Sequence, residues 1–167
     1  VRRDPREAAA RLGLVRLTWG QVGAGIGLAV ALVAGVQVLS LGLDRIWLAF
    51  GWPRTGGEGF DEAFSSLLAA YMSPLGAVVL AVTAGLGEEL AVRGVLQPRL
   101  GIVLSSLFFA SLHAYQYNWD GLIVVFALGL ALGLIRRRSS TNVSAIAHGS
   151  YDFILIVVML VSARLAG

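Results

Sequence analysis

Two adjacent glutamates and an arginine interrupt an otherwise apolar stretch of this sequence. Glu88 and Glu89 follow a run without charge that extends from residue 75 to residue 86, and Arg93 lies one helical turn further on. A charged side chain at the centre of a membrane-spanning helix costs about 2.5–3.5 kcal/mol on insertion scales, so such residues usually mark a functional site. We therefore predict that these three residues belong to a site inside a membrane.

The spacing of these charges suggests different roles for the two glutamates. Residues four apart share one face of a helix, so Glu89 and Arg93 can pair and lower the cost of burying both charges. Glu88 points about 100° away and is left without that partner, which suits a general base. Alternatively, the helix frays at Gly87 and both carboxylates simply lie among the lipid headgroups.

The two histidines of the chain fall in later apolar segments. Phe109 precedes His113 by one helical turn and would pack against its ring. Asp152 follows His148 by one turn and can accept a hydrogen bond from the ring N–H, which would fix the tautomer. Each histidine taken alone can instead be an ordinary hydrogen-bonding residue between helices.

Composition predicts that a polytopic helical membrane protein positions these residues. Of the 167 residues, 57% are hydrophobic and 14% are charged, whereas about 25% of the residues in soluble domains are charged. The long uncharged stretches predict an all-α bundle that forms a single membrane domain over residues 1–167. We expect about five transmembrane helices, at residues 19–43, 75–97, 100–119, 121–135 and 139–163.

Amphipathic interfacial helices are predicted at the membrane surface. Asp4-Pro5-Arg6-Glu7 has the features of a helix start and opens an interfacial N-terminal helix within residues 1–18. Apolar residues at helical spacing predict a second such helix at residues 60–72, ended near Ser73. Glycines spaced four apart predict close helix contacts at two pairs: Gly23 with Gly27, and Gly129 with Gly133.

The basic residues indicate orientation rather than a binding partner. All thirteen are arginine, and placing those of residues 2–16, Arg99 and residues 136–138 in the cytoplasm puts the N-terminus inside. They lie beside apolar segments and not on one soluble face, so nucleic acid is excluded as a partner. The absence of cysteine excludes disulfides and thiol nucleophiles.

Three motifs in this order resemble those of a known family. Residues 88–93 match the pattern E-E-x-x-x-R, residues 109–113 match F-x-x-x-H, and residues 148–152 match H-x-x-x-N with Asp152 in the last place. Over residues 75–156 the chain resembles the CAAX protease and bacteriocin-processing (CPBP, or Abi) family of intramembrane endopeptidases. The resemblance implies a multi-pass protein of the bacterial cytoplasmic membrane that cleaves a membrane-anchored or lipidated peptide.

The resemblance also implies a role for each matched residue. Glu88 with His113 would activate the attacking water, and His148 with Asp152 would stabilise the oxyanion. The remaining matched residues, Glu89, Arg93 and Phe109, would support the structure of the site. Because an ionised aspartate offers only acceptors, either Asp152 holds His148 as a cationic donor or the oxyanion role is weakened.

Two questions stay open at the level of sequence. We predict no cofactor, with zinc bound by Glu88, His113 and His148 as the alternative. We predict a protease whose partners are membrane lipid and a membrane-anchored substrate. The rival hypotheses are a catalytically silent scaffold or subunit of a larger membrane complex, which would have other membrane proteins as partners, and a proton relay of the transporter kind.

Overall fold

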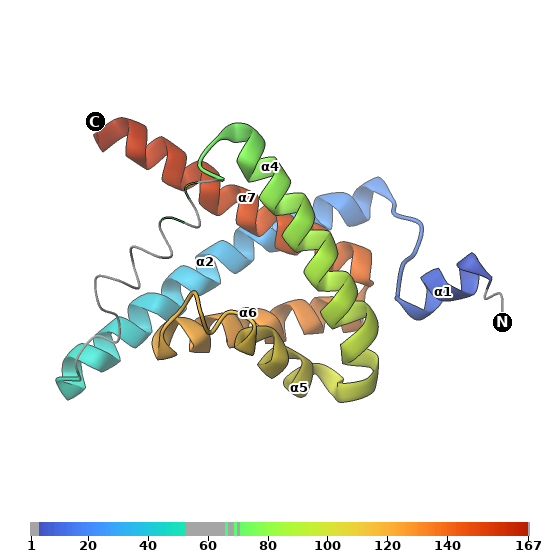
Figure 1. Ribbon diagram of the computed structural model, residues 1–167, viewed down its shortest axis with the longest axis horizontal. Coiled ribbons are helices and arrows are strands. Elements are labelled where there is room, and N and C mark those ends of the chain that lie inside the picture. Colours follow the sequence, from blue (N-terminus) through green and yellow to red (C-terminus); the bar gives the residue numbers. More distant parts are fainter. Residues whose placement is uncertain (1–3, 53–65, 67–68, 70, 167) are drawn as a thin grey trace.

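A computed structural model describes residues 4–52, 66, 69 and 71–166 of the chain. In this part of the chain the regular elements are all helical, which confirms the all-α class. The α-helices are α1 (Pro5–Arg11), α2 (Trp19–Phe50), α4 (Pro74–Thr83), α5 (Gln97–Ser111), α6 (Trp119–Arg138) and α7 (Thr141–Ala166) (Figure 1). The predicted amphipathic helix at residues 60–72 lies mostly outside the described residues.

Four helical stretches of the described residues are long and apolar enough to cross a membrane, which confirms a polytopic membrane bundle. Three of them correspond to the first, fourth and fifth predicted spans. The fourth stretch joins the second and third predicted spans into one element of 38 residues. The stretches are Trp19–Phe50, Pro74–Ser111, Trp119–Arg138 and Thr141–Leu165.

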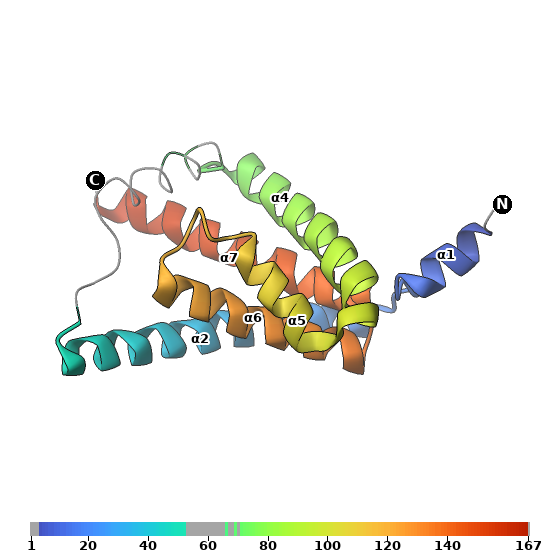
Figure 2. The ribbon, with the colours of Figure 1, turned by 60° about the horizontal axis from the view of Figure 1, so that its bottom comes forward.

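The stretch from Pro74 to Ser111 is not one straight rod. After α4 the chain continues as two wider π-helical turns, η1 (Ala84–Glu88) and η2 (Leu90–Leu96). It then reverses direction at Gly101, whose φ of 75° and ψ of 177° lie outside the helical region. Only glycine adopts such a conformation at little cost. Figure 2 shows the two arms, α4 and α5, meeting at one end of the bundle.

The third predicted span, residues 100–119, is therefore wrong in its bounds. Helix α5 ends at Ser111, and a turn follows in which His113 accepts backbone hydrogen bonds from the N–H groups of Gln116 and Tyr117. His113 thus lies in a turn and not inside an apolar helix. The physical reason is the polar character of the chain here, since Gln116, Asn118 and Asp120 fall within five positions of one another.

Helix α7 is the centre of the bundle and packs against α2, α4, α6 and both π-helical segments. One of its close approaches to the other helices is at a pair of glycines, Gly85 and Gly149. A β-carbon at Gly85 would lie only 2.8 Å from the Ala145 carbonyl oxygen and 2.9 Å from the Gly149 Cα. Two backbones can meet this closely only because neither position carries a side chain. This crossing brings Glu88 and Glu89 next to His148.

The predicted glycine contacts are half right. A β-carbon at Gly129 would lie 3.1 Å from Ser106 Cβ, and one at Gly133 would lie 2.9 Å from Ile102 Cγ2, so this pair does admit α5. At Gly23 and Gly27, in contrast, nothing in the described part of the chain comes within 4 Å of the β-carbon position. Their neighbour Gly25 makes the close contact of α2 instead, against Ile146 of α7.

The N-terminal helix is shorter than predicted, because α1 ends at Arg11 and residues 14–18 are not helical. The Asp4 side chain accepts a hydrogen bond from the Arg6 N–H at 2.9 Å and caps α1. The chain is then tied to the start of α7, because the Thr141 hydroxyl donates to the Leu12 carbonyl at 2.6 Å. No residue of α1 is buried, and Figure 2 shows this helix projecting from the bundle.

The crossing at Gly85 generates a first prediction. In Gly85→Ala the new methyl group meets backbone atoms that cannot rotate away, so we expect a loss of about 1–3 kcal/mol of stability. The measurement is unfolding in detergent micelles, followed by tryptophan fluorescence. Gly27→Ala is the matched control, because its methyl group enters open space and stability should not fall. Equal losses in the two variants would contradict the assignment.

Candidate active site

A fully buried ion-pair cluster lies at the centre of the site. Glu89 Oε2 lies 3.3 Å from Arg93 Nε, and both side chains are completely buried. The same oxygen accepts a hydrogen bond of 2.5 Å from the Ser144 hydroxyl. Glu89 Oε1 lies 3.3 Å from His148 Nδ1. The predicted Glu89–Arg93 pair is confirmed, and its carboxylate joins the η1–η2 segment to α7.

Phe109 connects this cluster to the second histidine. The Arg93 guanidinium carbon lies 5.1 Å from the centre of the Phe109 ring, a distance at which a cation and an aromatic face attract each other. The same ring lies 4.8 Å from the His113 ring and 5.7 Å from the His148 ring. Phe109 itself is 1% exposed, so it holds both imidazoles against the core.

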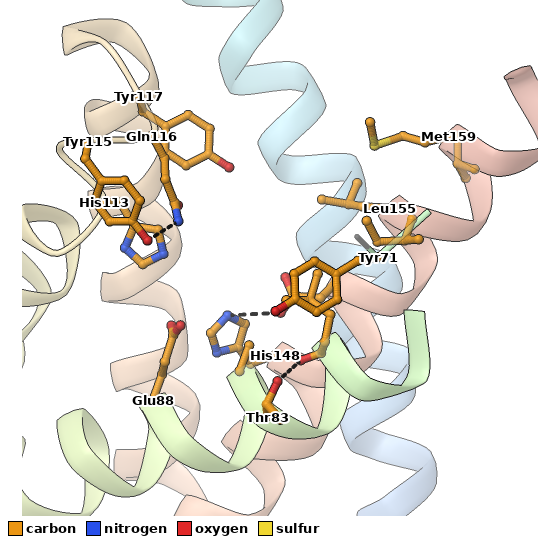
Figure 3. A pocket seen from close by; sticks show the side chains of 15 residues that line it. Tyr71, Thr83, Glu88, His113, Tyr115, Gln116, Tyr117, His148, Leu155 and Met159 are labelled. Atoms are coloured by element: carbon orange, nitrogen blue, oxygen red, sulfur yellow. Dashed lines mark hydrogen bonds and ion pairs between the residues drawn. The ribbon is translucent and has the colours of Figure 1, made fainter. Parts of the chain in front are cut away.

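The predicted catalytic residues line one cavity of about 580 Å³. Glu88, His113, His148 and Asp152 all contribute to its wall, although they come from three different segments of the chain. Figure 3 shows the Glu88 carboxylate pointing toward the space between the two imidazole rings. The alternative in which both glutamates lie among lipid headgroups is wrong, because Glu89 is buried and Glu88 faces this cavity.

The backbone assigns the tautomer of His113. Its Nδ1 lies 2.9 Å from the Phe109 carbonyl oxygen. A carbonyl only accepts, so Nδ1 carries the proton and, in the neutral ring, Nε2 keeps a lone pair. His113 can therefore accept a proton at Nε2 while its ring stays anchored to α5.

His148 lies between two carboxylates. Nδ1 faces Glu89, and Nε2 lies 3.6 Å from Asp152 Oδ2. Only the imidazolium form has a proton on both nitrogens and can serve both partners. The geometry therefore favours the first of the two possibilities for Asp152, in which this carboxylate holds His148 as a cationic donor.

The two neighbouring glutamates lie where the two π-helical segments meet. Glu88 is the last residue of η1, and Glu89 stands between η1 and η2. Single π turns within α-helices are rare and occur frequently at functional sites. Here Glu88 is directed to the cavity, while Glu89 is directed to Arg93 and Ser144.

The alternative zinc set is not assembled as the side chains stand. Among the described residues, no three histidine, aspartate or glutamate side chains are close enough together to hold a metal ion. Glu88, His113 and His148 share the cavity wall without converging on one point.

Sequence reasoning missed several polar residues of the site. Ser144 precedes His148 by one helical turn, and Tyr117 follows His113 by four positions, the same spacing that pointed to Asp152. The remaining polar side chains of the cavity wall are Tyr71, Thr83, Tyr115 and Gln116. Burial raises the pKa of Tyr117, and the nearby Asp152 and Glu88 carboxylates raise it further.

Fold and site together define a polytopic membrane protein with glutamate and histidine gathered inside its helical bundle. The model of the Type II CAAX prenyl endopeptidase Rce1-like family matches residues 70–154, about half of the chain. The chain belongs to this family, which confirms the resemblance to CPBP proteins and supports a membrane endopeptidase at the family level. Neither a curated protein nor a solved structure matches the chain.

The buried cluster generates a second prediction. Arg93→Met leaves the Glu89 carboxylate without its guanidinium, and breaking a buried pair costs about 3–5 kcal/mol. Equilibrium unfolding in mixed micelles measures the loss. Arg99→Met, at an exposed arginine of the same stretch, should stay within about 0.5 kcal/mol of the unmodified protein. If both variants unfold alike, the cluster does not stabilise the fold.

Proposed function

We propose that this protein is an intramembrane endopeptidase that hydrolyses a peptide bond of a membrane-anchored substrate. One observation carries the proposal: Glu88, His113 and His148, from three segments, line a single cavity within the bundle. A carboxylate, a neutral imidazole and a cationic imidazole supply the base and the oxyanion donor that amide hydrolysis requires.

The first half of the reaction is assigned to Glu88 and His113. Glu88 accepts a proton from water, with His113 Nε2 as the second acceptor, and the water oxygen attacks the scissile carbonyl carbon. When the C–N bond breaks, the proton passes to the leaving nitrogen, so that one water is consumed and an amine and an acid are released. Removing such a base typically costs about 10²–10⁴-fold in rate.

His148 is assigned to the developing oxyanion. As an imidazolium it keeps Nδ1 toward Glu89, and its Nε2–H, which lies 3.6 Å from Asp152 Oδ2 and is not hydrogen-bonded to it, donates to the carbonyl oxygen as negative charge forms there. A donor that is already oriented stabilises this charge without reorganising at the moment of reaction. Asp152 positions His148 and has no need to donate itself, which accounts for an aspartate where the family pattern has asparagine.

The side of the membrane that we propose for the reaction is inferred from which segments lie together at one end of the bundle. Figure 2 shows α1, the reversal between α4 and α5, and the turn between α6 and α7 at one end of the bundle. The arginines predicted to face the cytoplasm lie in or beside these segments. We assign this end to the cytoplasmic side of a bacterial cytoplasmic membrane, with a membrane-anchored or lipidated peptide as substrate.

The third prediction tests the base. Glu88→Gln keeps the shape of the side chain but cannot accept the proton, so we expect cleavage to fall about 10²–10⁴-fold while stability is unchanged. The assay is peptide release from membrane-anchored substrates, with and without a prenyl group, in vesicles containing the purified protein. Glu7→Gln, on α1, is the control and should cleave normally. An unmodified protein that cleaves none of these substrates would instead favour the membrane scaffold.

The fourth prediction concerns metal. Because the candidate ligands do not converge, we propose that the water is activated without a metal ion. Incubation with a strong chelator should leave the cleavage rate within about twofold of the untreated rate, measured in the same vesicles. Loss of activity that added zinc restores would contradict this proposal and would support zinc held by Glu88, His113 and His148.

A further inference from the structure

Ser144 carries a buried hydroxyl to which the proposed reaction gives no role. Its side chain is completely buried, so it does not touch substrate. It lies on α7 one helical turn before His148, and residues four apart share one face of a helix. Any influence of Ser144 on the reaction must therefore pass through the side chains that it contacts.

The Ser144 hydroxyl has two acceptors within reach and a single proton to give. Glu89 Oε2 lies 2.5 Å from Ser144 Oγ, and the Leu132 carbonyl oxygen lies 3.1 Å from it. Hydrogen bonds to an ionised carboxylate are shorter and stronger than those to a neutral carbonyl, at about 2.5–2.7 Å for a hydroxyl donor. The proton is therefore assigned to Glu89, and this bond joins α7 to the residue between η1 and η2.

This hydrogen bond fixes which oxygen of Glu89 faces the imidazole. The last side-chain torsion of a glutamate is broad, so the carboxylate turns easily unless its oxygens are held. Ser144 and Arg93 both contact Oε2, and the hydroxyl is the closer of the two, at 2.5 Å against 3.3 Å. Oε1 is thereby directed toward His148 Nδ1, which lies 3.3 Å from it.

The orientation of the His148 ring follows from the position of Glu89 Oε1. When Nδ1–H is directed at this oxygen, Nε2–H lies on the opposite side of the ring, toward the cavity. Figure 3 shows the His148 ring and the Glu88 carboxylate facing the same space. We propose that Ser144 is a positioning residue, which holds the Glu89 carboxylate and thereby keeps His148 Nε2–H directed at the developing oxyanion. This inference rests on the proposed function.

Variants at position 144 separate the hydrogen bond from side-chain packing. Ser144→Ala removes the hydroxyl, and Ser144→Cys fills its space with a thiol, which is a weak donor. Ser144→Thr keeps the hydroxyl. Ser106→Ala is the matched control, because Ser106 is also completely buried but its hydroxyl has no hydrogen-bond partner in the described part of the chain.

The first measurement observes the His148 ring directly by NMR in detergent micelles and needs no substrate. The chain has only two histidines, so ¹⁵N-labelled histidine gives few ring signals, and His113→Gln identifies those of His148. We expect Ser144→Ala and Ser144→Cys to shift the Nδ1 signal and to speed the exchange of its proton with water about three- to tenfold, the range for one hydrogen bond. Ser144→Thr and Ser106→Ala should leave both unchanged.

The second measurement is the rate of peptide release in vesicles. Removing an oxyanion donor typically lowers kcat about 10²–10³-fold, and a donor that is present but less well oriented should cost less. We expect kcat to fall about tenfold in Ser144→Ala and in Ser144→Cys. KM should stay within about twofold, because Ser144 does not touch substrate. Ser144→Thr and Ser106→Ala should retain the kcat of the unmodified protein.

The two measurements distinguish this inference from the proposed hydrolysis. His148 signals that are the same in Ser144→Ala and in the unmodified protein overturn the positioning role, as does an equal change in Ser106→Ala or an unchanged kcat in an active enzyme. If Ser144→Thr does not fold, Ser144→Cys against Ser106→Ala decides the question. If the signals change as expected but the unmodified protein cleaves no substrate, the proposed hydrolysis fails while the positioning of His148 by Ser144 stands.

Discussion

The structure of the site depends on one buried carboxylate. Glu89 interacts at once with a guanidinium, a hydroxyl and an imidazole, contributed by Arg93, Ser144 and His148. Charges placed in an apolar interior are costly unless they are paired, and Glu89 forms an ion pair with Arg93 and accepts a hydrogen bond from Ser144. Because the partners come from η2 and α7, this pairing ties the wide-turn segment to the central helix.

The junction also requires two backbones to approach closely. Gly85 and Gly149 remove the side chains that would separate η1 from α7. Glu88 ends η1 and Glu89 stands between η1 and η2, and the two side chains lie in different environments. Glu89 lies in the buried ion-pair cluster, and Glu88 lies on the wall of the cavity. A single pair of adjacent acidic residues thereby supplies both a structural anchor and a group that faces substrate.

Much of this arrangement could be predicted from sequence, because it follows from helical spacing. Arg93 four positions after Glu89, and Asp152 four after His148, gave contacts that the structure contains. The reversal within the predicted second and third spans could not be predicted in this way, because hydropathy does not reveal a change of chain direction at a single glycine such as Gly101. Likewise, the apolar pattern of α2 does not tell which of its glycines faces a neighbour, and Gly25 was missed for that reason.

The part of α5 that follows the chain reversal at Gly101 is short, and this has a consequence for the supply of water. From Gly101 to Ser111 the helix rises about 15 Å, roughly half the thickness of a hydrocarbon core. Backbone hydrogen bonds close the turn after Ser111, among them those that the His113 carbonyl accepts from Gln116 and Tyr117, and irregular backbone inside a membrane bundle is tolerated where it lines a cavity. Under the proposed function, the water that hydrolysis consumes reaches Glu88 through the cavity that this break in the helix helps to line.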